Sequence, residues 1–259
     1  MTRASREHFA SVVREEPVDL ALACLLIATE VTPTLDVPDS LRELDRLADG
    51  VDRRLPPVSG LQAALSGYRG SADDYDDLRS SLLPHVLRRR RGLPILLSVV
   101  WAEVAHRAGL RAYPIALPRH VIVGVGNPQD QLELVDPFHG GRRLTGLAAA
   151  VLAGRPVTED DIVPADPRDL LLRILTNIRV WAHTSERWRT RLWAVELSLL
   201  LPRHPVDLRR EHGRLLARAG DFDGAAAEIA AYADVLSSMD DDAARAAWDE
   251  ARLVRSRLN

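Results

Sequence analysis

Residues 5–67 carry apolar positions at the spacing of amphipathic helices. The run from Leu20 to Ile27 is apolar almost all round, which predicts a helix that is buried on every side. Asp39 and Ser40 can cap a following helix, because their side chains accept hydrogen bonds from the free N–H groups of its first turn. One face of that helix then holds Leu41, Leu44, Leu47 and Val51. The sequence therefore predicts an all-helical N-terminal region.

A polar, glycine-bearing loop at 68–79 separates this region from two further helices. A short helix is predicted at 80–91, with Gly92 as its stop. A longer helix is predicted from Pro94 to Gly109. Proline suits a first helical position, where no N–H is needed, and glycine readily adopts the left-handed conformation that ends many helices.

Three extended segments follow, and their spacing changes from helical to strand-like. They are Tyr113–Leu117, Arg119–Val125 and Gln131–Val135, of which the second is rich in β-branched residues. The stretch Gly-Asn-Pro-Gln-Asp between the last two has the composition of a turn. The sequence therefore predicts a β-hairpin at this point.

The expected register of the hairpin brings a histidine and an aspartate together. If Val125 pairs with Gln131 across the loop, His120 lies directly opposite Asp136. Residues so placed have Cβ atoms about 4.5–5.5 Å apart. A carboxylate at that distance can hold an imidazole in one tautomer and stabilise its cation. The pair is a candidate for acid–base chemistry, and a purely structural hydrogen bond is the alternative.

From Pro167 onward the pattern is helical to the end of the chain. Trp188 and Phe222 each follow a polar stretch and precede a helical run, and they are about 34 residues apart, the length of a tetratricopeptide repeat. A final amphipathic helix from about Asp241 would cap the array. The sequence predicts helical hairpins of this repeat type, with an unrelated helical bundle as the alternative.

Composition narrows the functional classes. The chain is 46% hydrophobic and 27% charged, and its formal net charge is −3, so no nucleic-acid or membrane partner is expected. Cys24 is the only cysteine, which excludes an internal disulfide and fits a reducing compartment. No apolar stretch is long enough to span a bilayer and no secretory signal pattern begins the chain, so a cytoplasmic protein is expected. Metal-ligand spacings are absent, and no cofactor is expected.

The stretch from Tyr75 to Val125, YDDLRSSLLPHVLRRRRGLPILLSVVWAEVAHRAGLRAYPIALPRHVIVGV, followed by ELVDPFHGG, resembles the SirB-type branch of transglutaminase-like proteins. The similarity runs to Leu144 and is weaker upstream. The resemblance implies an α+β fold with a transglutaminase- or papain-like core, in which one central helix packs on a small antiparallel sheet. It also implies C-terminal tetratricopeptide repeats. The expected organisation is a helical region at 1–74, the core at 75–155, a linker at 156–166 and the hairpins at 167–259.

The resemblance also implies the roles of three positions. Transglutaminase-like enzymes place a cysteine at the start of a helix, then a histidine and an aspartate on following strands. The last two positions match His120 and Asp136. The cysteine position falls on Pro94, where a helix N-terminus would favour a thiolate but proline offers no nucleophile. Proline at this position is usual for the SirB branch.

Other side chains could take part in the site. Ser98, one turn further along the same helix, could replace the nucleophile, or it could be a packed serine. Cys24 lies in the apolar helix and is expected to be inert. His139 could add an acid–base group. Arg119 stands where the family often has glycine, and its side chain could narrow the site or contact an anion.

The helix predicted at 80–91 ends in the run Arg88–Arg91 and also carries His85. Four cations at a helix C-terminus complement the helix dipole, which is the favoured interpretation, and phosphate binding is the alternative. His85 occupies a position where related proteins tend to be acidic. A surface histidine is the favoured interpretation for it.

These observations predict a module without a thiol nucleophile that binds a peptide or an acyl-type ligand near His120 and Asp136. Arg119, His139 and Pro94 are expected to border the ligand, and the repeats to add a groove for a protein partner. The alternative is a hydrolase or acyl-transfer enzyme. In that case His120 acts as general base on water or on a substrate nucleophile, and Asp136 orients it.

Overall fold

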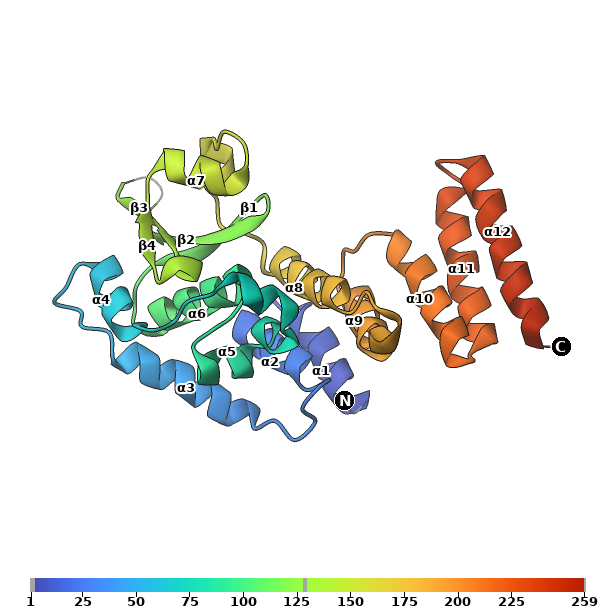
Figure 1. Ribbon diagram of the computed structural model, residues 1–259, viewed down its shortest axis with the longest axis horizontal. Coiled ribbons are helices and arrows are strands. Elements are labelled where there is room, and N and C mark those ends of the chain that lie inside the picture. The colour runs from blue at the N-terminus through green and yellow to red at the C-terminus, as the bar shows by residue number, and fades with distance from the viewer. Residues whose placement is uncertain (1–2, 128–129, 259) are drawn as a thin grey trace. The chain divides into compact units, whose positions relative to one another are not determined.

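The computed structural model describes residues 3–127 and 130–258 (Figure 1). The chain forms two compact units, residues 1–174 and residues 175–259. Within the described residues, no helix combines the length and the apolar character needed to cross a membrane. The expected α+β fold is confirmed, with a small antiparallel sheet in the first unit and, over the described residues 175–258, only helices in the second.

The first unit begins with four helices, α1 (Arg3–Val12), α2 (Leu20–Ala28), α3 (Val37–Asp49) and α4 (Pro57–Ala64). As predicted, α2 is buried on nearly every side. The predicted cap of α3 is wrong. The helix begins earlier, because the Asp36 side chain accepts from the Asp39 N–H at 2.8 Å and Pro38 lies in the first turn.

Two 3₁₀ turns, η1 (Ala72–Asp76) and η2 (Leu78–Ser81), occupy much of the predicted loop at 68–79 and the residues after it. Helix α5 (Leu83–Arg89) is shorter than expected, because Arg90 takes a left-handed conformation with φ 57° and ends it. The central helix α6 (Pro94–Arg107) has proline in its first turn, as predicted, and it is largely buried.

The sheet has four antiparallel strands in the order β1 (Ala112–Leu117), β2 (His120–Gly126), β3 (Leu132–Asp136) and β4 (Arg142–Leu144). The expected hairpin between β2 and β3 is present, but its register is wrong by two residues, because Val125 pairs with Glu133 rather than with Gln131. A shift of two keeps every side chain on its expected face.

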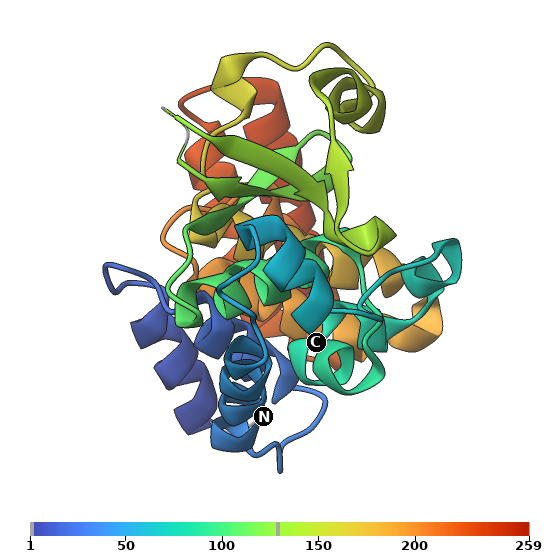
Figure 2. The same ribbon diagram turned by 90° about the vertical axis from the view of Figure 1, so that its left-hand side faces the viewer.

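Two helices enclose the sheet. Helix α6 packs against β1 and β2, and α7 (Gly146–Ala153), which the sequence analysis did not predict, lies on the opposite side (Figure 2). Ile115, Leu117 and Ile122 form an apolar cluster with Ala149 and Ala153 of α7. His120 shares the face of Ile122 by strand alternation, so it stands at the end of the face that α7 covers. The 3₁₀ turns η3 (Pro137–His139) and η4 (Glu159–Asp161) complete this part.

Helix α8 (Pro167–Trp181) contains the boundary between the two units. The second unit continues with the turn η5 (Ser185–Arg187) and with helices that pack in chain order, as Figure 1 shows for the last three. These helices are α9 (Trp188–Leu200), α10 (Asp207–Ala219), α11 (Phe222–Leu236) and α12 (Asp241–Arg255), followed by η6 (Ser256–Leu258).

Trp188 and Phe222 each open a helix, α9 and α11 respectively, so the repeat spacing corresponds to equivalent starting points. Their surroundings differ. Phe222 packs on the apolar cluster of α11 and α12, whereas the Trp188 ring lies 5.6 Å from the Arg218 guanidinium. In the first repeat, the guanidinium of Arg191 in α9 also forms an ion pair with Glu211 of α10 at 2.6 Å.

Gly213 permits the close approach of α10 to α11. A Cβ atom built on it would lie 2.6 Å from Cγ1 of Ile229 and 2.8 Å from the carbonyl oxygen of Ala225. Alanine is normally better than glycine in a helix interior by about 0.5–1 kcal/mol. We expect Gly213→Ala to lower the free energy of unfolding by about 1–3 kcal/mol instead, as overpacking does.

Urea unfolding of the full chain, followed by circular dichroism, measures this change. Gly146→Ala is the matched control, because a Cβ there meets no atom within 4 Å. Equal stabilities for Gly213→Ala and the wild type would contradict the close packing of α10 and α11.

Candidate functional site

His120 begins β2 and Asp136 ends β3. The Nε2 atom of His120 lies 2.9 Å from Oδ1 of Asp136, so the two side chains are hydrogen-bonded. Asp136 is fully buried and His120 is 8% exposed. With the observed register, the ladder would place Asp136 beside Ile122, and His120 therefore reaches it diagonally. The observed register differs from the expected one by two residues, so His120 and Asp136 still lie on the same face of the sheet and can meet.

The Asp136 carboxylate has further donors. Nδ1 of His139 lies 2.6 Å from Oδ2, and the Phe138 N–H donates to Oδ1 at 3.1 Å. Burial raises the pKa of Asp136, but the hydrogen bonds and charges of the two imidazoles outweigh it and hold that pKa below its usual range. Asp136 is therefore a carboxylate near neutral pH, and it can orient His120.

The carboxylate fixes how His120 can act. An ionised Asp136 only accepts hydrogen bonds, so Nε2 of His120 carries the proton and Nδ1 of a neutral ring is an acceptor. Within residues 3–127 and 130–258, the Nδ1 atom of His120 has no hydrogen-bond partner. It is also not fully buried. This nitrogen therefore reaches solvent through the exposed part of the side chain.

One aromatic side chain packs against both histidines. The Phe138 ring packs edge-on against His120, with centroids 6.0 Å apart, and against His139 at 5.3 Å. Tyr75 lies on its other side at 6.3 Å. Gly70 provides the room for Phe138, because a Cβ built there would lie 2.0 Å from the ring, and its N–H donates to the Phe138 carbonyl at 2.9 Å.

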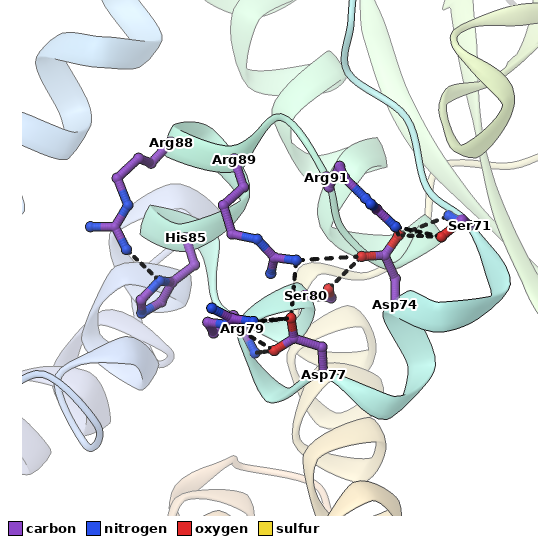
Figure 3. A network of polar contacts seen from close by, with 9 residues as sticks. All are labelled: Ser71, Asp74, Asp77, Arg79, Ser80, His85, Arg88, Arg89 and Arg91. Atoms are coloured by element: carbon purple, nitrogen blue, oxygen red, sulfur yellow. Dashed lines mark hydrogen bonds and ion pairs between the residues drawn. The ribbon is translucent and has the colours of Figure 1, made fainter.

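Residues 71–82, the strap, carry Tyr75 and are tied down by a buried carboxylate (Figure 3). Asp74 is 1% exposed. It accepts from the Ser71 N–H at 2.8 Å and from the Ser80 hydroxyl at 2.8 Å, and it pairs with Arg91 at 3.2 Å. These contacts hold the segment that places Tyr75 beside Phe138.

Arginines of the run Arg88–Arg91 form ion pairs with acidic side chains of the strap. Arg89 pairs with Asp77 at 3.0 Å, and Arg91 pairs with Asp74. Arg88 lies 2.8 Å from Nδ1 of His85, and burial together with this cation lowers the pKa of His85 (Figure 3). Two of the four cations are thus bound to acidic side chains of the strap.

Pro94 occupies the first position of α6 and is buried. This is the position at which the resemblance places the cysteine. Ser98, one turn further on, is fully buried, and its hydroxyl donates to the Val121 carbonyl at 3.2 Å. The Ser98 hydroxyl is therefore bonded to the residue that follows His120, and between these two described residues, Ser98 and His120, there is no hydrogen bond.

Arg119 lies in the tight turn between β1 and β2, directly before His120. Its φ of 66° is left-handed, a conformation in which glycine is relaxed and other residues are strained. Proline precedes it, as in turns whose third residue has a positive φ. The glycine that the family resemblance leads us to expect at this position would have this physical reason. The exposed Arg119 side chain extends towards Gly154 at the end of α7.

The single cysteine of the chain does not belong to the elements that form this site. Cys24 is buried in α2. Burial raises the pKa of its thiol strongly, and the charges of Glu103 and Asp19 raise it further. A thiol in this environment stays protonated and inert.

Three side chains that the sequence analysis missed border the site. Tyr75 and Phe138 lie within the stretches that carry the family resemblance, so the motif could have indicated them. Arg173 of α8 donates from Nη1 to the Leu117 carbonyl at 2.9 Å, and Leu117 pairs directly with His120. No local pattern marks this arginine, because only the fold brings α8 to the end of β1.

Two known families match parts of this chain. A family model described as the transglutaminase-like superfamily matches residues 38–176, and a tetratricopeptide repeat model matches residues 178–259. The chain belongs to the transglutaminase-like superfamily. The two matches meet inside α8, near the boundary between the compact units.

Individual relatives agree with this assignment. A UPF0162 protein of Xylella fastidiosa strain 9a5c is 31% identical over 248 residues, which cover 88% of each chain. The UPF0162 protein YchA of Escherichia coli K12 is 25% identical over 73% of this chain and 75% of its own. Protein SirB1 of Salmonella typhimurium is 23% identical over 71% of this chain and 75% of its own. No solved structure matches the chain.

The lowered pKa of Asp136 predicts a pH dependence of stability. A carboxyl group with a lowered folded-state pKa stabilises the fold above its unfolded pKa, about 3.9 for aspartate, and this stabilisation is lost as the pH falls through the folded pKa. We expect Asp136→Asn to lower the free energy of unfolding at pH 7 by about 1–3 kcal/mol. The variant should also lose less stability than the wild type below about pH 4.

Urea unfolding at pH 7, 5 and 3.5 measures both effects. Asp49→Asn is the control, because Asp49 is exposed at the end of α3. Identical pH profiles for the wild type and Asp136→Asn would show that the Asp136 carboxylate carries no net stabilisation.

Proposed function

We propose that this SirB-type protein is a binding module without a covalent nucleophile. Its transglutaminase-like unit holds a peptide or acyl-type ligand beside His120 and Asp136, and its repeat unit docks a protein partner. One observation carries the proposal: the histidine and the aspartate are hydrogen-bonded at 2.9 Å, while Pro94 stands at the position expected for the cysteine.

The energetics of acyl transfer support binding over catalysis. A covalent intermediate splits a difficult transfer into two easier steps, and proline cannot form one. A positioned histidine base alone contributes about 10²–10⁴-fold, against the roughly 10⁶-fold or more that enzymes achieve. The Ser98 hydroxyl is occupied by the Val121 carbonyl, so it does not compensate for the proline.

His120 offers a ligand a defined polar contact. Its Nδ1 atom accepts a hydrogen bond when the ring is neutral and donates one when the ring is protonated. Phe138 beside it supplies an apolar surface, and the half-exposed ring of His139 adds a second imidazole. An amide or acyl group combines a hydrogen-bonding oxygen with apolar neighbours, which suits these surroundings.

The match to tetratricopeptide repeats supports a protein-docking role for the second unit. A cavity of about 570 Å³ opens beside α9 and α10. Its lining contains Trp188, four arginines and two acidic residues; the arginines are Arg191, Arg210, Arg214 and Arg218. Arg218 donates to the Ser185 carbonyl at 2.8 Å and, in the described part of the unit, pairs with no carboxylate. Arg210 and Arg214 pair with Glu250, and Arg191 pairs with Glu211. Arg218 is therefore the lining cation that an acidic side chain of the partner would meet.

An enzyme is the second candidate, and one observation favours it. The Nδ1 atom of His120 has no partner within the described residues, while Asp136 holds the other nitrogen. A base that activates water needs this arrangement. The hydroxide equivalent would then attack an ester, thioester or amide carbonyl directly.

The two candidates differ in turnover. Acetyl-trialanine amide serves as the binding probe, observed by NMR, and the corresponding ethyl ester and thioester serve as substrates for hydrolysis and acyl transfer. We expect the wild type to bind the amide with no appreciable turnover of any of the three. His120→Ala should remain folded and bind at least tenfold more weakly, which is about 1.4 kcal/mol.

Controls separate the alternatives. His8→Ala changes an exposed histidine of α1, and it should bind like the wild type. Iodoacetamide treatment of the folded protein should leave binding unchanged, because Cys24 is buried. Substantial wild-type turnover that disappears in His120→Ala would establish the enzyme instead, and Ser98→Ala would then test whether the hydroxyl takes part.

A further inference from the structure

Arg173 stands at the edge of the His120 site. Its Nη1 atom donates to the carbonyl oxygen of Leu117 at 2.9 Å. Leu117 is the last residue of β1 and pairs directly with His120 across the tight turn. The guanidinium group is therefore held at the end of the same strand pair that presents the imidazole.

Arg173 lacks the acidic partner that comparable arginines of the first unit have. Arg168, one and a half turns earlier in α8, pairs with Glu16 at 2.8 Å, and Arg107 pairs with Asp45 at 2.9 Å. Among the residues that the structure describes, none forms an ion pair with Arg173. Its side chain is nevertheless partly withdrawn from water, and this burial lowers its pKa. A cation in such a position is normally paired, because desolvation without a counter-charge is costly.

The neighbours of Arg173 connect it to the imidazole. Burial lowers the pKa of Arg173, and the nearby Tyr75 phenol opposes this effect. Burial raises the pKa of Tyr75, and the charge of Arg173 opposes that effect. Tyr75 is 52% exposed and packs against Phe138, which packs against His120. Tyr75 and Phe138 thus form a continuous aromatic surface that leads to His120.

The carboxylate nearest to His120 is not available to Arg173. Asp136 is the carboxylate of the site, and its two oxygens are already bound to His120 and His139. Arg142 lies 4.0 Å from the same carboxylate and adds a second cation. A carboxylate on the ligand would supply the counter-charge that Arg173 lacks, with the planar, bidentate geometry that guanidinium favours. A neutral ligand would leave Arg173 without a counter-charge.

We propose that Arg173 makes the His120 site selective for ligands that carry a carboxylate near the acyl group that His120 contacts. This inference rests on the proposed ligand site at His120 and names the chemical class of its ligand. The carboxylate can belong to the C-terminus of a peptide or to an acidic side chain, since both present the same group. Arg173 is thus a specificity-determining residue, and it takes no part in bond formation.

Three peptides test the inference and distinguish the two sources of carboxylate. They are acetyl-trialanine with a free carboxylate, acetyl-Ala-Glu-Ala amide, and the neutral acetyl-Ala-Gln-Ala amide. Each is titrated into the full chain while the His120 side-chain NMR signals are followed. We expect at least one of the two acidic peptides to bind the wild type tenfold or more tightly than the neutral peptide. The preferred acidic peptide identifies the source.

Variants assign the preference to Arg173. Arg173→Gln should remove the preference for the acidic peptide, and it should weaken binding of the acidic peptide far more than binding of the neutral one. Arg173→Lys should keep part of it, because the charge remains and the bidentate geometry is lost. Arg168→Gln is the control on the same helix, and it should behave like the wild type. The wild-type preference should also weaken as the salt concentration rises, a test that needs no variant.

The outcomes separate this inference from the proposed function. Equal binding of acidic and neutral peptides to the wild type, or a preference that survives in Arg173→Gln, would overturn the role of Arg173 and leave the ligand site at His120 standing. A wild type whose His120 signals respond to none of the three peptides would overturn both.

Discussion

The buried carboxylate of Asp136 is the interaction on which the site depends. A fully buried negative charge is tolerated only with donors around it, and Asp136 has the Phe138 N–H and the imidazoles of His120 and His139. These donors come from the start of β2 and from the turn after β3. Satisfying one charge therefore fixes the end of the hairpin, the path of the following turn and the orientation of the histidine.

The same turn joins the site to the rest of the first unit. Phe138 packs against both histidines and requires glycine at position 70. The strap that follows Gly70 is held by the buried carboxylate of Asp74. The strap places Tyr75 at the rim. Two buried carboxylates, each surrounded by donors, thus organise the two chain segments that border His120. Such polar networks are stabilising only when every member is satisfied.

Much of the geometry of the His120 site could be predicted from the sequence, for identifiable reasons. Strand alternation has a period of two, so the sequence placed His120 and Asp136 on one face although the register was wrong by two residues. The error arose because Gly126, with φ 113°, belongs to β2 and pairs with Leu132, which lengthens the ladder beyond the predicted turn. Arg173 was beyond the reach of sequence reasoning, because a single arginine in a helical pattern carries no signal until the fold places it.

The orientation of His120 is the central claim, and its tautomer tests that claim most directly. Two-bond ¹H–¹⁵N NMR spectra of the imidazole, recorded near neutral pH on the full chain, distinguish a proton on Nε2 from one on Nδ1. The carboxylate at 2.9 Å requires the proton on Nε2 in the wild type, with Nδ1 unprotonated in the neutral ring. Asp136→Asn should weaken this preference. A wild-type ring that carries its proton on Nδ1, or that exchanges freely between the two forms, would contradict the account.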